Sequence, residues 1–140
     1  MTDANEKTVE RFYHELWNTW DLSVANDVLA EDIRFRGTLG SMLEGREAFK
    51  GYVETVRRAF PDWHNRIDEV ISCGDRVVTR MTWSGTHEGR LIDVEPTGAH
   101  VEYVGVAIFR LSEGKIVEAW VVGDTQELWR ALGQLPRGRA

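Results

Sequence analysis

Hydrophobic residues in the first third of the chain recur with the spacing of helices. Between residues 9 and 20 they fall three or four positions apart, which predicts an amphipathic helix (Val9, Phe12, Tyr13, Leu16, Trp17 and Trp20). Asp21 is suited to cap a second, short helix over residues 22–29. A brief strand is expected around Ile33 and Phe35, and a third helix from about residue 45 until Pro61 ends it.

From residue 63 onward, the pattern changes to the two-residue alternation of β-strands. Four strands are predicted, over residues 63–72, 76–86, 100–111 and 115–122. Gly74 and Gly114 suit tight hairpin turns, and a longer loop covers residues 88–99. A last short helix is expected over about residues 124–132. Helices kept apart from an antiparallel meander define an α+β fold, in which a curved sheet packs on the N-terminal helices.

The strand over residues 100–111 is apolar on both of its faces. Tyr103 and Phe109 lie on one face, and Val104 and Ile108 lie on the other. One face can be covered by the helices and by an apolar pocket. The opposite, outer face needs a second layer, and another copy of the chain would supply it. The pattern therefore predicts a homodimer formed through the outer face of the sheet.

The composition narrows the classes of protein that are compatible with this pattern. The chain has 140 residues, 42% of them hydrophobic, so residues 1–135 are expected to form one domain and residues 136–140 a disordered tail. The net charge of −6 disfavours binding to nucleic acid. No apolar run is long enough to cross a membrane, and the N-terminus does not resemble a signal peptide. The single cysteine, Cys73, favours a cytoplasmic location.

Five short motifs occur in an order and spacing that resemble one known family, the SnoaL-like polyketide (ester) cyclases of the nuclear transport factor 2-like superfamily. The motifs are AFPD at 59–62, GDRV at 74–77, WSGTHEG at 83–89, PTG at 96–98 and GKIVEAW at 114–120. The resemblance implies a cone-shaped sheet around a deep pocket, a homodimer or higher oligomer, and no cofactor. It also implies ring closure of a polyketide-like ester by intramolecular aldol condensation, with Asp124 as acid and base.

Asp124 has two interpretations in the sequence alone. It shares a two-residue alternation with Glu118 and Trp120, and a carboxylate beside an apolar pocket would be a stronger base. However, Asp124 and Glu127 also form the pattern of a capping box at the start of the last helix. A capping carboxylate would point at backbone N–H groups instead of the pocket, so the direction of this side chain distinguishes the two roles.

The remaining candidates are aromatic and polar residues expected at the pocket. His87 is a second candidate for catalysis, by polarising a carbonyl or orienting Asp124, and its alternative is a loop histidine whose ring bonds a nearby backbone carbonyl. The expected substrate-binding residues are Tyr13, Trp17, His64, Met81, Trp83, Tyr103, Glu118 and Trp120. Glu118 has the alternative of pairing with Arg80 or Arg110. No spacing of histidines or carboxylates is typical of a metal site, and no nucleotide-binding motif occurs.

Three functions are therefore compatible with the sequence. The first is a cofactor-independent cyclase acting on a small hydrophobic or polyketide-like substrate. The second is an epoxide hydrolase, or an isomerase similar to ketosteroid isomerase, using the same pocket. The third is a binding protein that releases its hydrophobic ligand unchanged, because one fold can host many functions.

Overall fold

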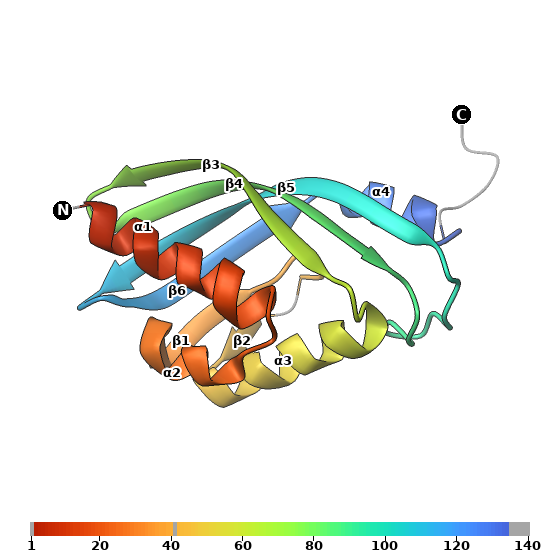
Figure 1. Ribbon diagram of the computed structural model, residues 1–140, viewed down its shortest axis with the longest axis horizontal. Coiled ribbons are helices and arrows are strands. Elements are labelled where there is room, and N and C mark those ends of the chain that lie inside the picture. The colour runs from red at the N-terminus through yellow and green to blue at the C-terminus, as the bar shows by residue number, and fades with distance from the viewer. Residues whose placement is uncertain (1, 41, 135–140) are drawn as a thin grey trace.

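A six-stranded curved sheet wraps around the N-terminal helices in the computed structural model, which describes residues 2–40 and 42–134 (Figure 1). The helices are α1 (Thr2–Arg11), η1 (Phe12–Trp17), η2 (Leu22–Val24), α2 (Ala25–Val28), α3 (Arg46–Ala59) and α4 (Thr125–Ala131). The strands are β1 (Leu29–Arg36), β2 (Met42–Glu44), β3 (His64–Cys73), β4 (Arg76–Thr86), β5 (His100–Ser112) and β6 (Lys115–Gly123). The predicted α+β fold is confirmed, whereas the predicted tail at residues 136–140 lies outside the described residues.

The strands follow the order β2-β1-β6-β5-β4-β3. Strands β3 to β6 form the predicted antiparallel meander. Strand β1 pairs in parallel with β6 and places the N-terminal segment at one side of the meander, and β2 extends that side. The parallel pair and β2 were not predicted, because pairing between distant segments leaves no mark on local alternation. The sheet is curved and not closed into a barrel.

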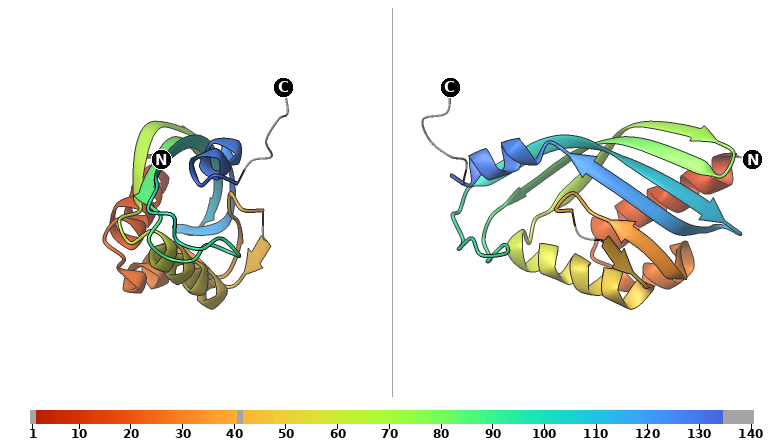
Figure 2. Two further views of the ribbon diagram at one scale, coloured as in Figure 1. Left: turned by 90° about the vertical axis from the view of Figure 1, so that its right-hand side faces the viewer. Right: turned by 180° about the vertical axis from the view of Figure 1, so that it is seen from behind.

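The concave face of the sheet covers the helices, and Figure 2 shows the strands as an arc closed below by α1, α2 and α3. The core lies between these layers and includes Leu16, Phe49 and Phe109, each of which is fully buried. The loop over residues 87–99 crosses one end of the arc. None of the helices in residues 2–40 and 42–134 is long and apolar enough to span a bilayer.

Candidate ligand-binding cavity

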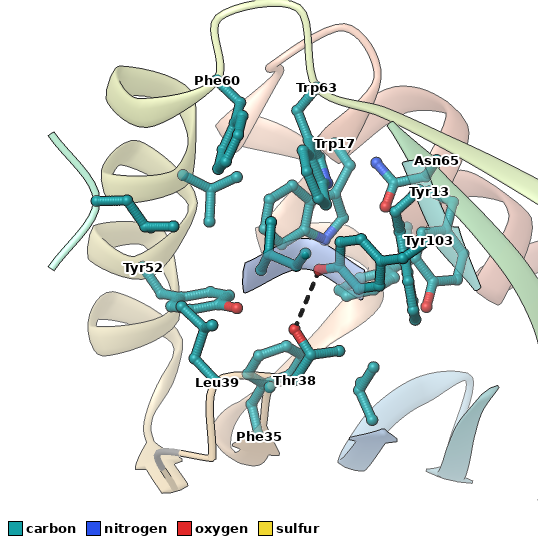
Figure 3. Close-up of a pocket in the computed structure, with 17 residues that line it drawn as sticks. Tyr13, Trp17, Phe35, Thr38, Leu39, Tyr52, Phe60, Trp63, Asn65 and Tyr103 are labelled. Atoms are coloured by element: carbon teal, nitrogen blue, oxygen red, sulfur yellow. Dashed lines mark hydrogen bonds between the residues drawn. The ribbon is translucent and has the colours of Figure 1, made fainter. Parts of the chain in front are cut away.

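A cavity of about 60 Å³ lies between the concave face of the sheet and the helices. Figure 3 shows side chains from all of these layers turned toward the same hollow. The helices contribute part of the lining, and the strands and loops contribute the rest. The lining residues are Phe12, Tyr13, Trp17, Phe35, Gly37, Thr38, Leu39, Tyr52, Val56, Phe60, Trp63, Asn65, Trp83, Leu91, Tyr103, Val121 and Leu128.

The first helix supplies three of these rings through a change in its winding. After Arg11 the α-helix continues as the π-helical turn η1, in which the Asn18 N–H donates to the carbonyl of Tyr13 at 2.9 Å. The wider turn buries the adjacent pair Phe12 and Tyr13, and Trp17 one turn later. π-Helical turns occur often at functional sites, because they redirect side chains that a regular helix would point elsewhere.

Asn18 also connects this turn to the sheet. Its side-chain Oδ1 accepts from the backbone N–H of Asn65 at 2.8 Å and from Asn65 Nδ2 at 3.0 Å. Its Nδ2 donates to the Asn65 carbonyl at 2.9 Å. These bonds hold the start of β3 against η1, and they fix the buried Asn65 amide at the cavity.

The cavity surface is apolar except for a few neutral groups. Four hydroxyls, from Tyr13, Thr38, Tyr52 and Tyr103, and the amide of Asn65 are the polar side chains that line it, apart from the indole N–H groups. None of the seventeen lining residues is a carboxylate, a histidine, a lysine or an arginine. The cavity as described can therefore bind and polarise a ligand through neutral hydrogen bonds, but it holds no strong base.

Three of the hydroxyls converge on one side of the cavity. The Oγ1 of Thr38 and the hydroxyl oxygen of Tyr103 form a hydrogen bond of 3.4 Å, drawn dashed in Figure 3. The Tyr52 hydroxyl points toward the same region from α3. Burial raises the pKa of Tyr103 to about 12, and burial also raises the pKa values of Tyr52 and Tyr13. All three phenols therefore remain protonated donors at neutral pH.

Glycines bring the backbone close to these rings. A Cβ at Gly37 would lie 2.7 Å from the Tyr52 hydroxyl oxygen, so only glycine leaves room for it. A Cβ at Gly123 would lie 3.1 Å from a ring carbon of Tyr103 and 3.2 Å from the methyl group of Thr38. The hydroxyl side of the cavity is thus positioned by residues without side chains in β6 and after β1.

His87 anchors the loop that crosses the end of the cavity. Its Nδ1 accepts from the Thr97 N–H at 3.2 Å and lies 3.0 Å from the Thr97 hydroxyl. Burial lowers the pKa of His87, which favours the neutral ring that can accept this bond. The same loop places Leu91 on the cavity surface. The ring of His87 does not line the cavity, and it holds the loop as the alternative reading expected, although it bonds the N–H and hydroxyl of Thr97 and not the expected carbonyl.

Tyr13, Trp17, Trp83 and Tyr103 line the cavity, as the sequence predicted. Met81 is fully buried but does not line the cavity. His64 is exposed at the start of β3 and lies outside the lining.

The expectation that Glu118, Trp120 and Asp124 face the cavity is corrected. Glu118 and Trp120 lie on the outer face of β6, and Asp124 follows the end of this strand. Trp120 is 42% exposed, and the guanidinium carbon of Arg36 lies 4.8 Å from the centroid of its ring. Glu118 instead pairs with Arg110 at 3.3 Å, one of the two arginines expected for it.

The physical reason is a one-residue bulge in the β5–β6 hairpin. Near the turn, Leu111 pairs with Ile116, but beyond the bulge Phe109 pairs with Ala119 instead of Glu118. A shift of one residue exchanges the two faces of a strand. Ala119 and Val121 therefore point inward in place of Glu118 and Trp120.

Asp124 caps the last helix. Its carboxylate accepts from the Glu127 N–H at 3.3 Å, and its side chain is exposed. The adjacent Gly123 packs against cavity residues, and Leu128 of α4 lines the cavity. Asp124 is thus next in sequence to residues at the cavity, but its exposed carboxylate is bonded to the backbone of α4 and is not part of the lining.

Sequence reasoning missed several of the lining residues. Thr38 and Asn65 were not singled out, because a lone threonine after a strand and a lone asparagine in one carry no local signal. Leu91 lies in a loop that has no periodicity. A usable signal was present at Thr38, which follows a glycine directly after a strand of alternating apolar and charged residues, where a close approach of the backbone is common.

The fold and the site together define a class of protein, an α+β cone whose cavity is apolar and lined by uncharged side chains. The family model for SnoaL-like polyketide cyclases matches residues 7–132, and the chain belongs to this family. No curated protein matches the chain in sequence.

Solved structures with the same fold are similar over nearly the whole chain. A protein from Jannaschia sp. CCS1, described as a SnoaL-like polyketide cyclase, is 24% identical with a TM-score of 0.88, covering 96% of this chain and 95% of that one. AclR from Streptomyces galilaeus, described as a hydroxylase, is 28% identical with a TM-score of 0.84, covering 99% and 87%. IdmH from Streptomyces antibioticus, described as a polyketide cyclase, is 27% identical with a TM-score of 0.79, covering 91% and 97%.

Proposed function

We propose that this protein binds a small polyketide-like molecule in its cavity and promotes closure of a ring by intramolecular aldol condensation. The observation that carries the proposal is an apolar, ring-lined cavity in a chain of the SnoaL-like polyketide cyclase family. Such a cavity favours a folded conformer of a flexible apolar substrate. Holding two reacting groups together can supply about 7–11 kcal/mol of an activation barrier.

The reaction forms a carbon–carbon bond between two parts of one substrate. A methylene between two carbonyls loses a proton, the resulting enolate carbon attacks a third carbonyl, and the new alkoxide takes up a proton. In our proposal the substrate's own acidity makes a strong base unnecessary, so the proton is lost to water. Hydrogen bonds from neutral donors in the cavity stabilise the enolate and the alkoxide.

The version of this reaction with Asp124 as acid and base has less support. Its carboxylate would have to leave the Glu127 N–H and turn past Gly123 to reach the substrate. The exposed capping position gives it neither the desolvation nor the direction that the role requires. Epoxide opening has less support still, because the seventeen lining residues include no arginine and no carboxylate.

Turnover of an aromatic polyketide methyl ester tests the proposal. Liquid chromatography with mass spectrometry should detect a ring-closed isomer of unchanged mass. Leu39→Trp fills the cavity and should abolish this product, whereas Ile71→Trp, on an exposed position of β3, should not. Full turnover by folded Leu39→Trp protein would contradict a reaction inside the cavity.

A second candidate is a binding protein that does no chemistry. It is favoured by one observation, that no carboxylate, histidine, lysine or arginine is among the seventeen residues around the cavity. Chromatography of the ligand released after long incubation separates the two candidates, because a binder would return the polyketide ester unchanged and a cyclase would return its ring-closed isomer.

We also propose that two copies associate through the outer face of the sheet. Val104, Ile108, Trp120 and Val122 are between 37% and 54% exposed on neighbouring strands, and Ile108 pairs directly with Trp120. A patch of adjacent large apolar side chains is typical of an interface. Sedimentation should therefore detect twice the 16.0 kDa chain mass, and Trp120→Glu should return the protein to a monomer. A monomeric wild-type protein at micromolar concentration would reject the dimer.

A further inference from the structure

We propose that the hydroxyls of Thr38 and Tyr103 form a binding site for a neutral carbonyl oxygen of the ligand. This inference rests on the proposed use of the cavity for ligand binding. It adds the chemical class of the group that is recognised, a ketone, quinone or ester carbonyl, and the residues that recognise it. It does not depend on whether the bound molecule is then cyclised.

The distance between the two hydroxyls would allow both of them to donate to a third oxygen. The two oxygens lie 3.4 Å apart, which is long for a bond between hydroxyls, where about 2.7–2.8 Å is usual. Only one of the two protons can lie between these oxygens, so the other can turn to a ligand oxygen or to the neighbouring Tyr52 hydroxyl. An oxygen placed beside both hydroxyls could accept from each of them at normal distances, in exchange for one long bond.

Apolar side chains surround the hydroxyls of Thr38 and Tyr103 within the cavity. Tyr103 is 5% exposed, and its ring contacts the ring of Trp83, with centroids 5.4 Å apart. Phe35 and Leu39 lie on the same side of the cavity. A carbonyl buried among these groups would lose its water and needs a replacement donor. The two hydroxyls are the donors that would satisfy it.

The lining also indicates the charge of the ligand group. No lysine, arginine or histidine is among the seventeen lining residues, so a buried carboxylate would have no cation to offset its desolvation. The raised pKa values of Tyr52 and Tyr103 keep both phenols as proton donors, not as anions. The arrangement therefore suits a neutral acceptor better than a carboxylate.

Three probes of almost the same shape test this chemistry: acetophenone, benzoate and ethylbenzene. Titration calorimetry or competition against a fluorescent apolar dye gives each dissociation constant. We expect acetophenone to bind about three- to tenfold more tightly than ethylbenzene, and benzoate to bind more weakly than both. Equal binding of acetophenone and ethylbenzene, or tighter binding of benzoate, would overturn the proposal.

Variants connect the preference to the two hydroxyls. Thr38→Val and Tyr103→Phe each remove one hydroxyl with little change in shape, and together they should abolish the preference for acetophenone over ethylbenzene. The infrared stretch of the bound acetophenone carbonyl should move to higher frequency in both variants, because a hydrogen bond to oxygen lowers it. A merely structural role for these residues would not move this band.

Thr79→Val is the matched control. Thr79 is buried outside the lining, and its hydroxyl is directed at Tyr13, not at the pair formed by Thr38 and Tyr103. This variant should keep both the preference and the carbonyl frequency of the wild type. An unchanged frequency in Thr38→Val and Tyr103→Phe would reject the carbonyl site even if the protein turns over a polyketide ester. Failure of turnover with the preference intact would reject only the cyclase function.

Discussion

The carboxylate of Asp124 accepts a hydrogen bond from the backbone N–H of Glu127, and the distance between Oδ1 and the nitrogen is 3.3 Å. The bond closes the first turn of α4. It makes Asp124 a helix cap. Of the two roles that the sequence left open for this residue, the bond supports the cap over the acid and base.

Substitution of Asp124 tests its role directly. Asparagine caps helices as well as aspartate, so Asp124→Asn should leave the free energy of unfolding nearly unchanged, while Asp124→Ala should lower it by about 1 kcal/mol. Both can be measured by urea denaturation. We expect Asp124→Asn to retain turnover of the polyketide ester. Loss of turnover in a stable Asp124→Asn protein would instead assign it the acid–base role.

The buried tyrosines predict a loss of stability in alkali. The pKa of Tyr103 is about 12 in the folded chain, raised by burial from 10.0, so the unfolded chain releases this proton first. The free energy of unfolding should therefore fall as the pH rises from about 10 to about 12, by roughly 1 kcal/mol at pH about 11 from Tyr103 alone. Denaturation of Tyr103→Phe over the same range should show a shallower fall, and an equal slope would contradict the assignment.

Gly105 and Gly51 should respond oppositely to alanine. A Cβ at Gly105 would lie 2.4 Å from the Val122 carbonyl oxygen and 2.4 Å from a ring carbon of Trp83, so Gly105→Ala should cost about 1–3 kcal/mol. Gly51 is exposed in α3 with open space around it, and Gly51→Ala should add about 0.5–1 kcal/mol. Thermal denaturation measures both. Near-ultraviolet circular dichroism should also report displacement of Trp83 in the first variant alone.

The loop over residues 87–99 contains a strained residue at its tip. Ile92 has a φ of +54°, which is unfavourable for a β-branched side chain, and it is 62% exposed. Ile92→Gly should therefore raise the free energy of unfolding by about 1 kcal/mol, because glycine accepts this conformation without strain. Ile92→Ala removes the same side chain but keeps most of the strain, so it should stabilise less. A gain with alanine as large as that with glycine would attribute the effect to lost apolar exposure.

Much of the architecture follows from local patterns in the sequence. The two-residue alternation identified strands β3 to β6, because one face of each strand must be buried. Pro61 and the turn glycines Gly74 and Gly114 marked where elements end, since their backbones are restricted or unusually free. Four of the predicted pocket residues, including Tyr13 and Tyr103, line the cavity for the same reason: they lie on the apolar stripes.

Only the tertiary structure decided which face of β6 meets the cavity. Glu118, Trp120 and Val122 do share one face, as alternation predicted, but the bulge beside Leu111 turns that face outward, and Asp124 lies beyond the end of the strand. A bulge changes the pairing partner without changing the periodicity of either strand, so it has no signature in the alternation itself. Thr38, Asn65 and Leu91 reach the cavity for a related reason: the curvature of the sheet and the path of a loop bring distant segments together. The sequence by itself determined the elements and their apolar faces, whereas long-range pairing decided which side chains a ligand would meet.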